Sequence, residues 1–237
     1  ENPANAYRAI ANVGSSWLSR EILFGVLFAG VGFLFAIMQW RKLGTPNVRI
    51  IVAGVAAILG VGLVYSMARV YMLPNQPSWN SATTPLSFFT TTLLLGALAT
   101  GAAYSINYTY LKLRSDKGLT VQSGLLRDAL RWIALASIVL VGLQLVLISA
   151  NLINQTTQEA SAAVAEIGEQ YRAIYILRVA LVFIGAGVFA FFLYRYTVSA
   201  TKEEALAGLV YGAFALVLVA EVLGRYLFYA THIQIGL

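Results

Sequence analysis

The stretch ALAGLVYGAFALVLVAEVLGRYLFYA, residues 205–230, decides the fold. It is longer than the roughly 20 residues that an α-helix needs to cross a hydrocarbon core of about 30 Å. Its apolar residues form a continuous run, whereas the strands of a membrane barrel alternate apolar and polar residues. The stretch therefore predicts a transmembrane helix.

The rest of the chain has the same character. Of its 237 residues, 59% are hydrophobic and only 11% are charged, which is too apolar for a water-soluble globule. We expect an all-α fold, a polytopic transmembrane helical bundle forming a single integral membrane domain over residues 1–237. Residues 1–20 are too polar to span and are expected to be an interfacial segment, or alternatively a solvated loop. Six spans are expected at about 21–40, 48–73, 84–108, 126–151, 174–196 and 205–230.

The charges between the spans predict the orientation of the bundle. Lys and Arg gather in or beside the connections that follow the first, third and fifth spans: Arg41, Lys42, Arg49, Lys112, Arg114, Lys117, Arg195 and Lys202. Because short cytoplasmic loops of membrane proteins are enriched in Lys and Arg, these connections should be cytoplasmic and both termini should lie outside. This bias also accounts for the net charge of +6, so the expected partner is the lipid bilayer and not nucleic acid.

The composition limits the cofactors that the protein itself can hold. It contains no cysteine and one histidine. Thiolate-bound iron–sulfur or zinc sites are therefore excluded, and two axial imidazoles for a haem cannot both come from this sequence. We predict no haem and no metal site here.

Of the charged residues inside or at the edges of the spans, five fall toward the outer side: Glu21, Arg69, Arg178, Glu221 and Arg225. A charge at the middle of a bilayer costs on the order of 3 kcal/mol, so such residues are candidates for a functional site. Glu221 and Arg225 stand four apart on one helix face, in the order that favours an ion pair. A purely structural pair is therefore the alternative for these two.

Aromatic side chains occur near both ends of the spans. The outer side carries groups that can hydrogen-bond or stack on a ring: Tyr71, Trp79, Tyr226, Tyr229 and His232. Each aromatic residue taken singly also fits an ordinary interfacial belt, and a lone histidine fits an exposed surface position. At the cytoplasmic end of the third span, we interpret Tyr104, Tyr108 and Tyr110 as belt residues only.

A quinol would suit such a place. Its tail dissolves in lipid, its ring needs hydrogen-bond partners, and its oxidation releases two protons that a carboxylate such as Glu21 at the water edge could accept. The residues alone leave another class of function open. A secondary transporter or ion-translocating helical bundle would use the same buried acids and bases.

Three stretches of the sequence resemble one family over the length of the protein. They are Pro3 through Val13-Gly14 to Ser19-Arg20-Glu21-Ile22; Ala68-Arg69-Val70-Tyr71 with Pro77-Ser78-Trp79 and Thr84-Pro85-Leu86-Ser87-Phe88-Phe89; and Ala220-Glu221-Val222-Leu223-Gly224-Arg225 with Phe228-Tyr229 and His232. Their order and spacing resemble the membrane anchor subunit of anaerobic dimethyl sulfoxide reductase, a complex iron–sulfur molybdoenzyme.

The resemblance implies a function in anaerobic respiration. The family anchor has eight helices, of which this chain would contain the last six, in the bacterial cytoplasmic membrane with both termini periplasmic. It implies an oxidoreductase subunit that oxidises menaquinol near the periplasmic face. The electrons would pass to an iron–sulfur subunit and then to a catalytic subunit with a molybdenum bis-pterin cofactor.

The resemblance also assigns site residues. Glu21 is the expected catalytic residue, because it matches the family motif. Together with the reasoning from charge and depth, the expected quinol-binding residues are Arg69, Tyr71, Trp79, Glu221, Arg225 and His232.

Overall fold

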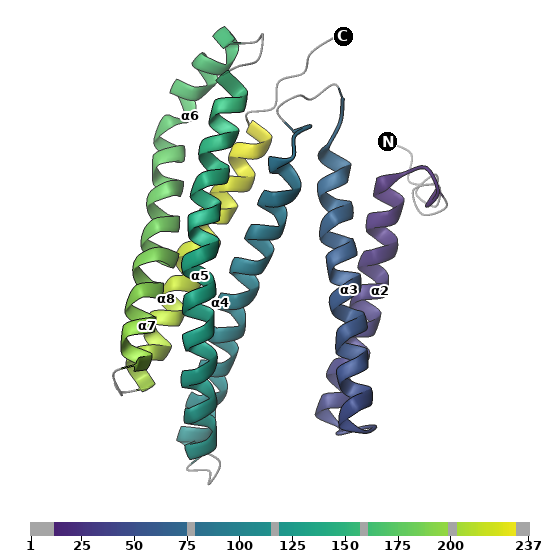
Figure 1. Ribbon diagram of the computed structural model, residues 1–237, viewed down its shortest axis with the longest axis vertical. Coiled ribbons are helices and arrows are strands. Elements are labelled where there is room, and N and C mark those ends of the chain that lie inside the picture. The colour runs from purple at the N-terminus through teal and green to yellow at the C-terminus, as the bar shows by residue number, and fades with distance from the viewer. Residues whose placement is uncertain (1–11, 75–78, 115–118, 157–160, 199–202, 231–237) are drawn as a thin grey trace. The chain divides into compact units, whose positions relative to one another are not determined.

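The structure, a computed structural model, describes residues 12–74, 79–114, 119–156, 161–198 and 203–230. Every regular element in these residues is helical, which confirms the all-α prediction (Figure 1). The elements are α2 (Trp17–Trp40), α3 (Pro46–Tyr71), α4 (Thr83–Leu113), α5 (Leu119–Thr156), α6 (Ser161–Val182), the π-helix η2 (Phe183–Val188), α7 (Phe189–Val198) and α8 (Glu203–Ala230).

Six helical segments of the described residues are long and apolar enough to cross a membrane. The fifth of them, Glu169–Phe192, runs through α6, η2 and the start of α7. The six predicted spans are thus confirmed, with ends that differ by a few residues. The described residues form two compact units, one up to Phe89 and the other from Thr90 onward. Each unit is described below by itself.

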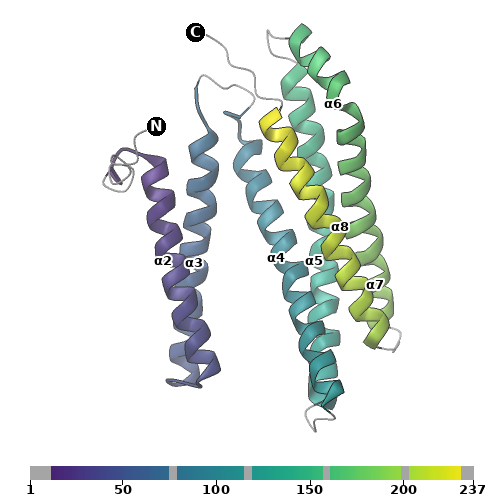
Figure 2. The ribbon, with the colours of Figure 1, turned by 180° about the vertical axis from the view of Figure 1, so that it is seen from behind.

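The first unit contains the antiparallel hairpin of α2 and α3 (Figure 2). Helix α2 begins at Trp17, four residues before the predicted span, because the Ser16 side chain accepts a hydrogen bond from the Ser19 backbone N–H at 3.4 Å and so caps the helix. Arg20 then ties the preceding segment to the first turn. Its Nε donates to the Val13 carbonyl at 2.8 Å, and its Nη2 donates to the Gly14 carbonyl at 2.7 Å.

The turn between α2 and α3 is fixed by its local chemistry. Gly44 adopts a φ of 70°, a left-handed conformation that glycine reaches without a steric penalty. Thr45 then caps α3 by accepting from the Val48 backbone N–H at 3.4 Å, and Pro46 occupies the first turn, where no backbone N–H is needed. The turn therefore ends one span and starts the next within a few residues.

Glycines allow the two helices of the hairpin to pack closely. A Cβ atom at Gly62 would lie 2.6 Å from Cε1 of Phe24, and one at Gly60 would lie 3.2 Å from Cε2 of Phe28. The two phenylalanine rings, one turn apart on α2, thus occupy space that side chains on α3 would otherwise fill. Small residues at such contacts are typical of helix pairs in membranes.

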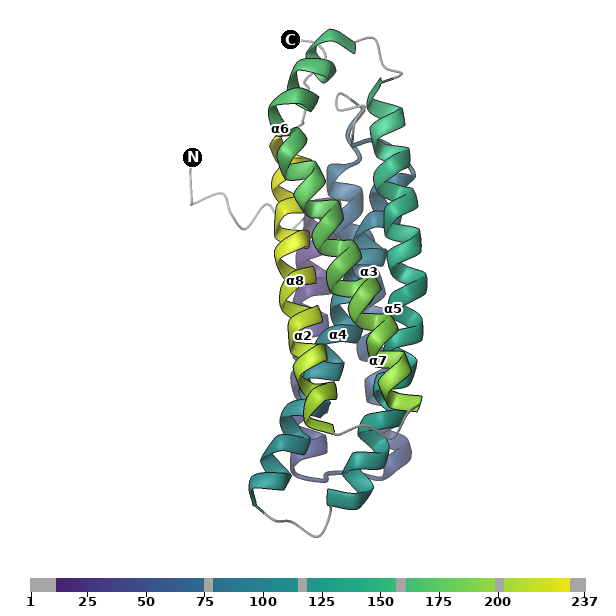
Figure 3. The same ribbon diagram turned by 90° about the vertical axis from the view of Figure 1, so that its left-hand side faces the viewer.

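The second unit is a bundle of α4, α5, the α6–η2–α7 rod and α8 (Figure 3). Its core has two apolar clusters, and each takes residues from α4, α5 and α8. One is formed by Leu94, Leu98, Val141, Val182, Ala186, Ala213, Val217 and Ala220. The other is formed by Ala102, Tyr108, Leu126, Leu130, Ala134, Leu206 and Val210.

The π-helix η2 lies against α8. Gly185 is buried, and a Cβ atom at this position would lie 2.7 Å from Cβ of Leu216. A π-helical turn holds one residue more than the α-helical pattern allows, and it changes which residues face a neighbouring helix. The rod can therefore pack against α8 on both sides of η2, and Arg178 lies just before this change of register.

Candidate functional site

The predicted site residues divide between the two units. Glu21, Arg69, Tyr71 and Trp79 belong to the first unit, whereas Glu221 and Arg225 belong to the second. His232 lies outside the described residues.

In the first unit, Trp17 is the centre of a cationic and aromatic group. The guanidinium carbon of Arg20 lies 4.4 Å from the centroid of its ring, and that of Arg69 lies 4.9 Å from the same centroid. Tyr65 makes an edge contact with the ring at 5.7 Å between centroids. Both arginines are within the range of a cation–π interaction, so one ring holds two positive charges close together.

Glu21 lies one helical turn after Trp17, on the same side of α2. It is half-buried. Within the described part of the protein, its carboxylate forms no hydrogen bond and no ion pair. A carboxylate in this position can accept a proton without first breaking a contact to another side chain.

Tyr71 and Trp79, both predicted site residues, meet in the first unit. Their ring centroids are 5.7 Å apart in an edge-to-face arrangement, and Tyr71 also lies 5.8 Å from Phe88. The backbone of Trp79 is held by Thr84, whose Oγ1 donates to the Trp79 carbonyl at 2.6 Å. The start of α4 thus orders the segment that carries Trp79.

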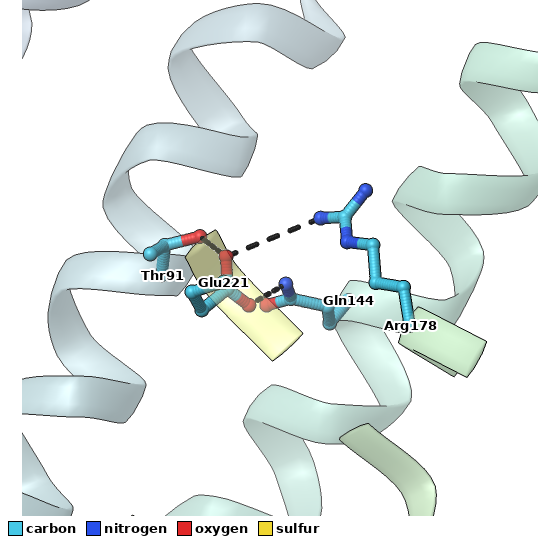
Figure 4. A network of polar contacts seen from close by, with 4 residues as sticks. All are labelled: Thr91, Gln144, Arg178 and Glu221. Atoms are coloured by element: carbon cyan, nitrogen blue, oxygen red, sulfur yellow. Dashed lines mark hydrogen bonds and ion pairs between the residues drawn. The ribbon is translucent and has the colours of Figure 1, made fainter. Parts of the chain in front are cut away.

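In the second unit, Glu221 is the centre of a buried polar network drawn from four helices (Figure 4). Glu221 on α8 is 5% exposed. Its Oε2 accepts from Thr91 Oγ1 on α4 at 2.9 Å and lies 4.0 Å from Nη2 of Arg178 on α6. Its Oε1 accepts from Nε2 of Gln144 on α5. Several partners are what a buried carboxylate needs in an apolar surrounding.

Arg178 reaches Glu221 because residue 224 is a glycine. A Cβ atom at Gly224 would lie 2.5 Å from Nε of Arg178 and 2.6 Å from its Cζ. The guanidinium thus lies directly against the backbone of α8.

The sequence did not predict two members of this network. Thr91 lies within a run of three threonines, and Gln144 is a lone amide in an otherwise apolar stretch. Gln144 carries a signal that sequence reasoning could have used, because an uncharged polar group inside a span also needs a partner. Thr91 carries no such signal, since a threonine can bond to its own helix.

Tyr108 corrects another interpretation. It was expected to be a belt residue, but it is 6% exposed and packs in the core with Leu126 and Leu130. Tyr104 and Tyr110, also on α4, are exposed as expected. A tyrosine near the end of a span can lie at the membrane interface or in the core. The sequence does not distinguish the two positions, because they depend on how the helix packs against its neighbours.

In the described residues, no group of three or more His, Cys, Asp or Glu side chains lies close enough together to hold a metal ion. The polar groups that gather are Arg, Gln, Thr, Trp and single carboxylates. Such groups bind by hydrogen bonds, charge and stacking.

Residues 2–231 match the protein-family model described as "DMSO reductase anchor subunit (DmsC)". The protein belongs to the DMSO reductase anchor subunit family. Six apolar helices in its described residues make this member of the anchor family a multi-pass membrane protein.

Individual proteins support the assignment to the anchor family. The sequence is 30% identical over 244 residues to anaerobic dimethyl sulfoxide reductase chain YnfH of Escherichia coli strain K12, covering 100% of this protein and 75% of that one. It is also 30% identical to an anaerobic dimethyl sulfoxide reductase protein of Haemophilus influenzae, covering 99% and 75%. A second anaerobic dimethyl sulfoxide reductase protein of Escherichia coli K12 is 29% identical, covering 100% and 75%. No solved structure matches.

Proposed function

We propose that this anchor-family protein binds and oxidises menaquinol near the periplasmic face of the bacterial cytoplasmic membrane. It holds the iron–sulfur subunit and the molybdenum catalytic subunit of a dimethyl sulfoxide reductase-type complex at the membrane, and it passes electrons to the iron–sulfur subunit. Membership of the anchor family supports this role over that of a secondary transporter. Both ends of the protein are proposed to lie on the periplasmic side, following the positive-inside rule.

The observation that carries the proposal is the surroundings of Glu21. A half-buried carboxylate with no side-chain partner in the described residues lies one turn from Trp17, whose ring is flanked by Arg20 and Arg69. The carboxylate supplies a proton acceptor. Arg69 supplies a positive charge and donor groups for a ring oxygen, and its Nε is buried without a hydrogen-bond partner in the described residues.

The reaction balances with a partner that accepts electrons. Oxidation of one quinol to one quinone breaks two O–H bonds and releases two protons and two electrons. Glu21 accepts the protons in turn and releases them to periplasmic water. The electrons reduce the iron–sulfur clusters of the adjoining subunit, because this sequence has no cysteine to hold a cluster of its own.

The remaining predicted residues are proposed to assist in binding the quinol. Tyr71 and Trp79 provide ring faces beside the outer end of α3, and they suit the apolar side of a quinol ring. Glu221 and Arg225 are proposed as quinol-binding residues from their charge and depth, and Glu221 is held in the polar network of the second unit. His232 is proposed as a ring-oxygen ligand from its place in the sequence alone.

The test is replacement of Glu21 by Gln in the complete complex. We expect Glu21→Gln to abolish turnover with a short-tailed naphthoquinol and to leave both assembly and turnover with reduced viologen unchanged, because viologen reduces the partner subunits directly. Asp128→Asn is the matched control, since Asp128 is an exposed carboxylate of α5. Normal quinol turnover in Glu21→Gln would remove the proposed role of Glu21.

A further inference from the structure

The polar network around Glu221 has two hydrogen-bonding atoms left over. The Nε of Arg178 and the Oε1 of Gln144 are both buried, and neither has a hydrogen-bond partner in the part of the protein that the structure describes. Gln144 is only 4% exposed. Leaving such an atom unpaired in an apolar surrounding costs about 1–3 kcal/mol, so a native protein seldom keeps two of them in one network without a ligand or a water to satisfy them.

The two leftover atoms are of opposite kinds. Nε of Arg178 is a donor, and Oε1 of Gln144 is an acceptor. Both side chains are held by the same carboxylate, because Nη2 of Arg178 and Nε2 of Gln144 each face an oxygen of Glu221. A hydroxyl group, which donates one hydrogen bond and accepts others, matches this donor and acceptor. A carbonyl oxygen has no hydrogen to donate, so it can pair only with Nε of Arg178.

Ring-stacking groups are present on the same pair of helices. Tyr171 of α6 and Tyr226 of α8 are in edge contact with centroids 5.9 Å apart, and Tyr171 lies two turns before Arg178 on its helix. Tyr175 lies between them along α6. The side chain of Arg178 is 16% exposed whereas that of Glu221 is 6% exposed, so the arginine is the member that a ligand from the lipid phase would reach first.

We propose that Arg178 and Gln144 bind a ring hydroxyl of the quinol, Arg178 by donating from Nε and Gln144 by accepting at Oε1. This inference rests on the proposed function and concerns binding residues within the second unit. Glu221 and Gly224 are positioning residues: the carboxylate orients both side chains, and the missing Cβ of residue 224 admits the guanidinium. Because Oε1 of Gln144 needs a donor, the pair favours the reduced ligand over the quinone.

The matched glycines of α8 give the sharpest test. In Gly224→Ala, the new Cβ would lie 2.5–2.7 Å from Nε, Cζ and Nη2 of Arg178, so the guanidinium must move. In Gly208→Ala on the same helix, the new Cβ meets nothing within 4 Å. We expect Gly224→Ala to raise the KM for a short-tailed naphthoquinol about tenfold in the complete complex, the effect of losing one hydrogen bond to a charged group. Gly208→Ala should leave the KM unchanged, and viologen turnover should be unchanged in both.

A second variant distinguishes the loss of a ligand contact from a structural effect. Arg178→Lys keeps a positive charge for Glu221 but has no Nε–H, and we expect the same rise in KM with an unchanged kcat. A KM equal to that of the wild type in both variants would overturn the inference and leave the proposed function standing. Failure of both variants to assemble would assign Arg178 a structural role and also overturn it. Failure of the wild-type complex to oxidise the naphthoquinol would instead refute the proposed function.

Discussion

Nη2 of Arg178 on α6 lies 4.0 Å from Oε2 of Glu221 on α8, and both side chains are largely buried. The exposed pair of Arg172 and Glu169 offers a contrast, with a 3.4 Å separation and side chains that are 67% and 75% exposed. An exposed pair contributes little to stability, because water screens it and its side chains lose entropy. A buried pair behaves differently, since removing one partner leaves the other charge in an apolar place.

This difference predicts a non-additive mutant cycle. We expect Arg178→Leu and Glu221→Leu each to lower the free energy of unfolding by about 3 kcal/mol, because each leaves a buried charge without the opposite charge on the neighbouring helix. The double variant should lose much less than the sum of the two. Thermal unfolding of the purified complex in detergent measures the cycle. Additive losses would show that the two charges are independent.

A second prediction concerns the close packing of α2 and α3. Gly62→Ala places a Cβ 2.6 Å from the Phe24 ring, and we expect it to destabilise the complex by about 1–3 kcal/mol through overpacking. Gly54→Ala on the same helix is the control, because a Cβ there meets nothing within 4 Å. Adding Phe24→Leu should restore part of the loss in Gly62→Ala. Equal melting temperatures for the two glycine variants would contradict the packing described.

The π-helix supplies a third prediction. Gly185→Ala would place a Cβ 2.7 Å from Cβ of Leu216, whereas Gly187→Ala would make only ordinary contacts, the nearest at 3.7 Å to Phe183. We expect Gly185→Ala to lower the melting temperature clearly and Gly187→Ala to change it little. Leu216→Gly should rescue Gly185→Ala in part, because it removes the Cβ atom that the new methyl group would meet. An absence of rescue would argue against a direct contact between η2 and α8.

The proposed orientation can be tested with single cysteines, because the sequence has none of its own. Asn80 and Lys42 are exposed residues at opposite ends of α3, beyond its C-terminus and before its N-terminus. We expect a membrane-impermeant maleimide to label Asn80→Cys in intact spheroplasts. Lys42→Cys should be labelled only after the membrane is opened. The reverse pattern would invert the proposed topology.

The sequence alone determined the six membrane helices and the family. Both follow from local properties: a span needs a continuous apolar run such as residues 205–230, and turns need residues such as Gly44 and Thr45-Pro46. It also identified Glu221 as a costly buried charge. Such a cost is readable in one helix without knowledge of its neighbours.

The tertiary structure decided which side chains satisfy that charge. Spacing along α8 pointed to Arg225, and the structure adds Thr91, Gln144 and Arg178, which reach Glu221 from α4, α5 and α6. The tertiary structure likewise placed Tyr108 in the core. It also explains why residue 224 is a glycine, since the guanidinium of Arg178 occupies the space that a Cβ atom would fill. A sequence specifies separations along one helix, whereas contacts between helices depend on how each rod is rotated and shifted when the bundle packs.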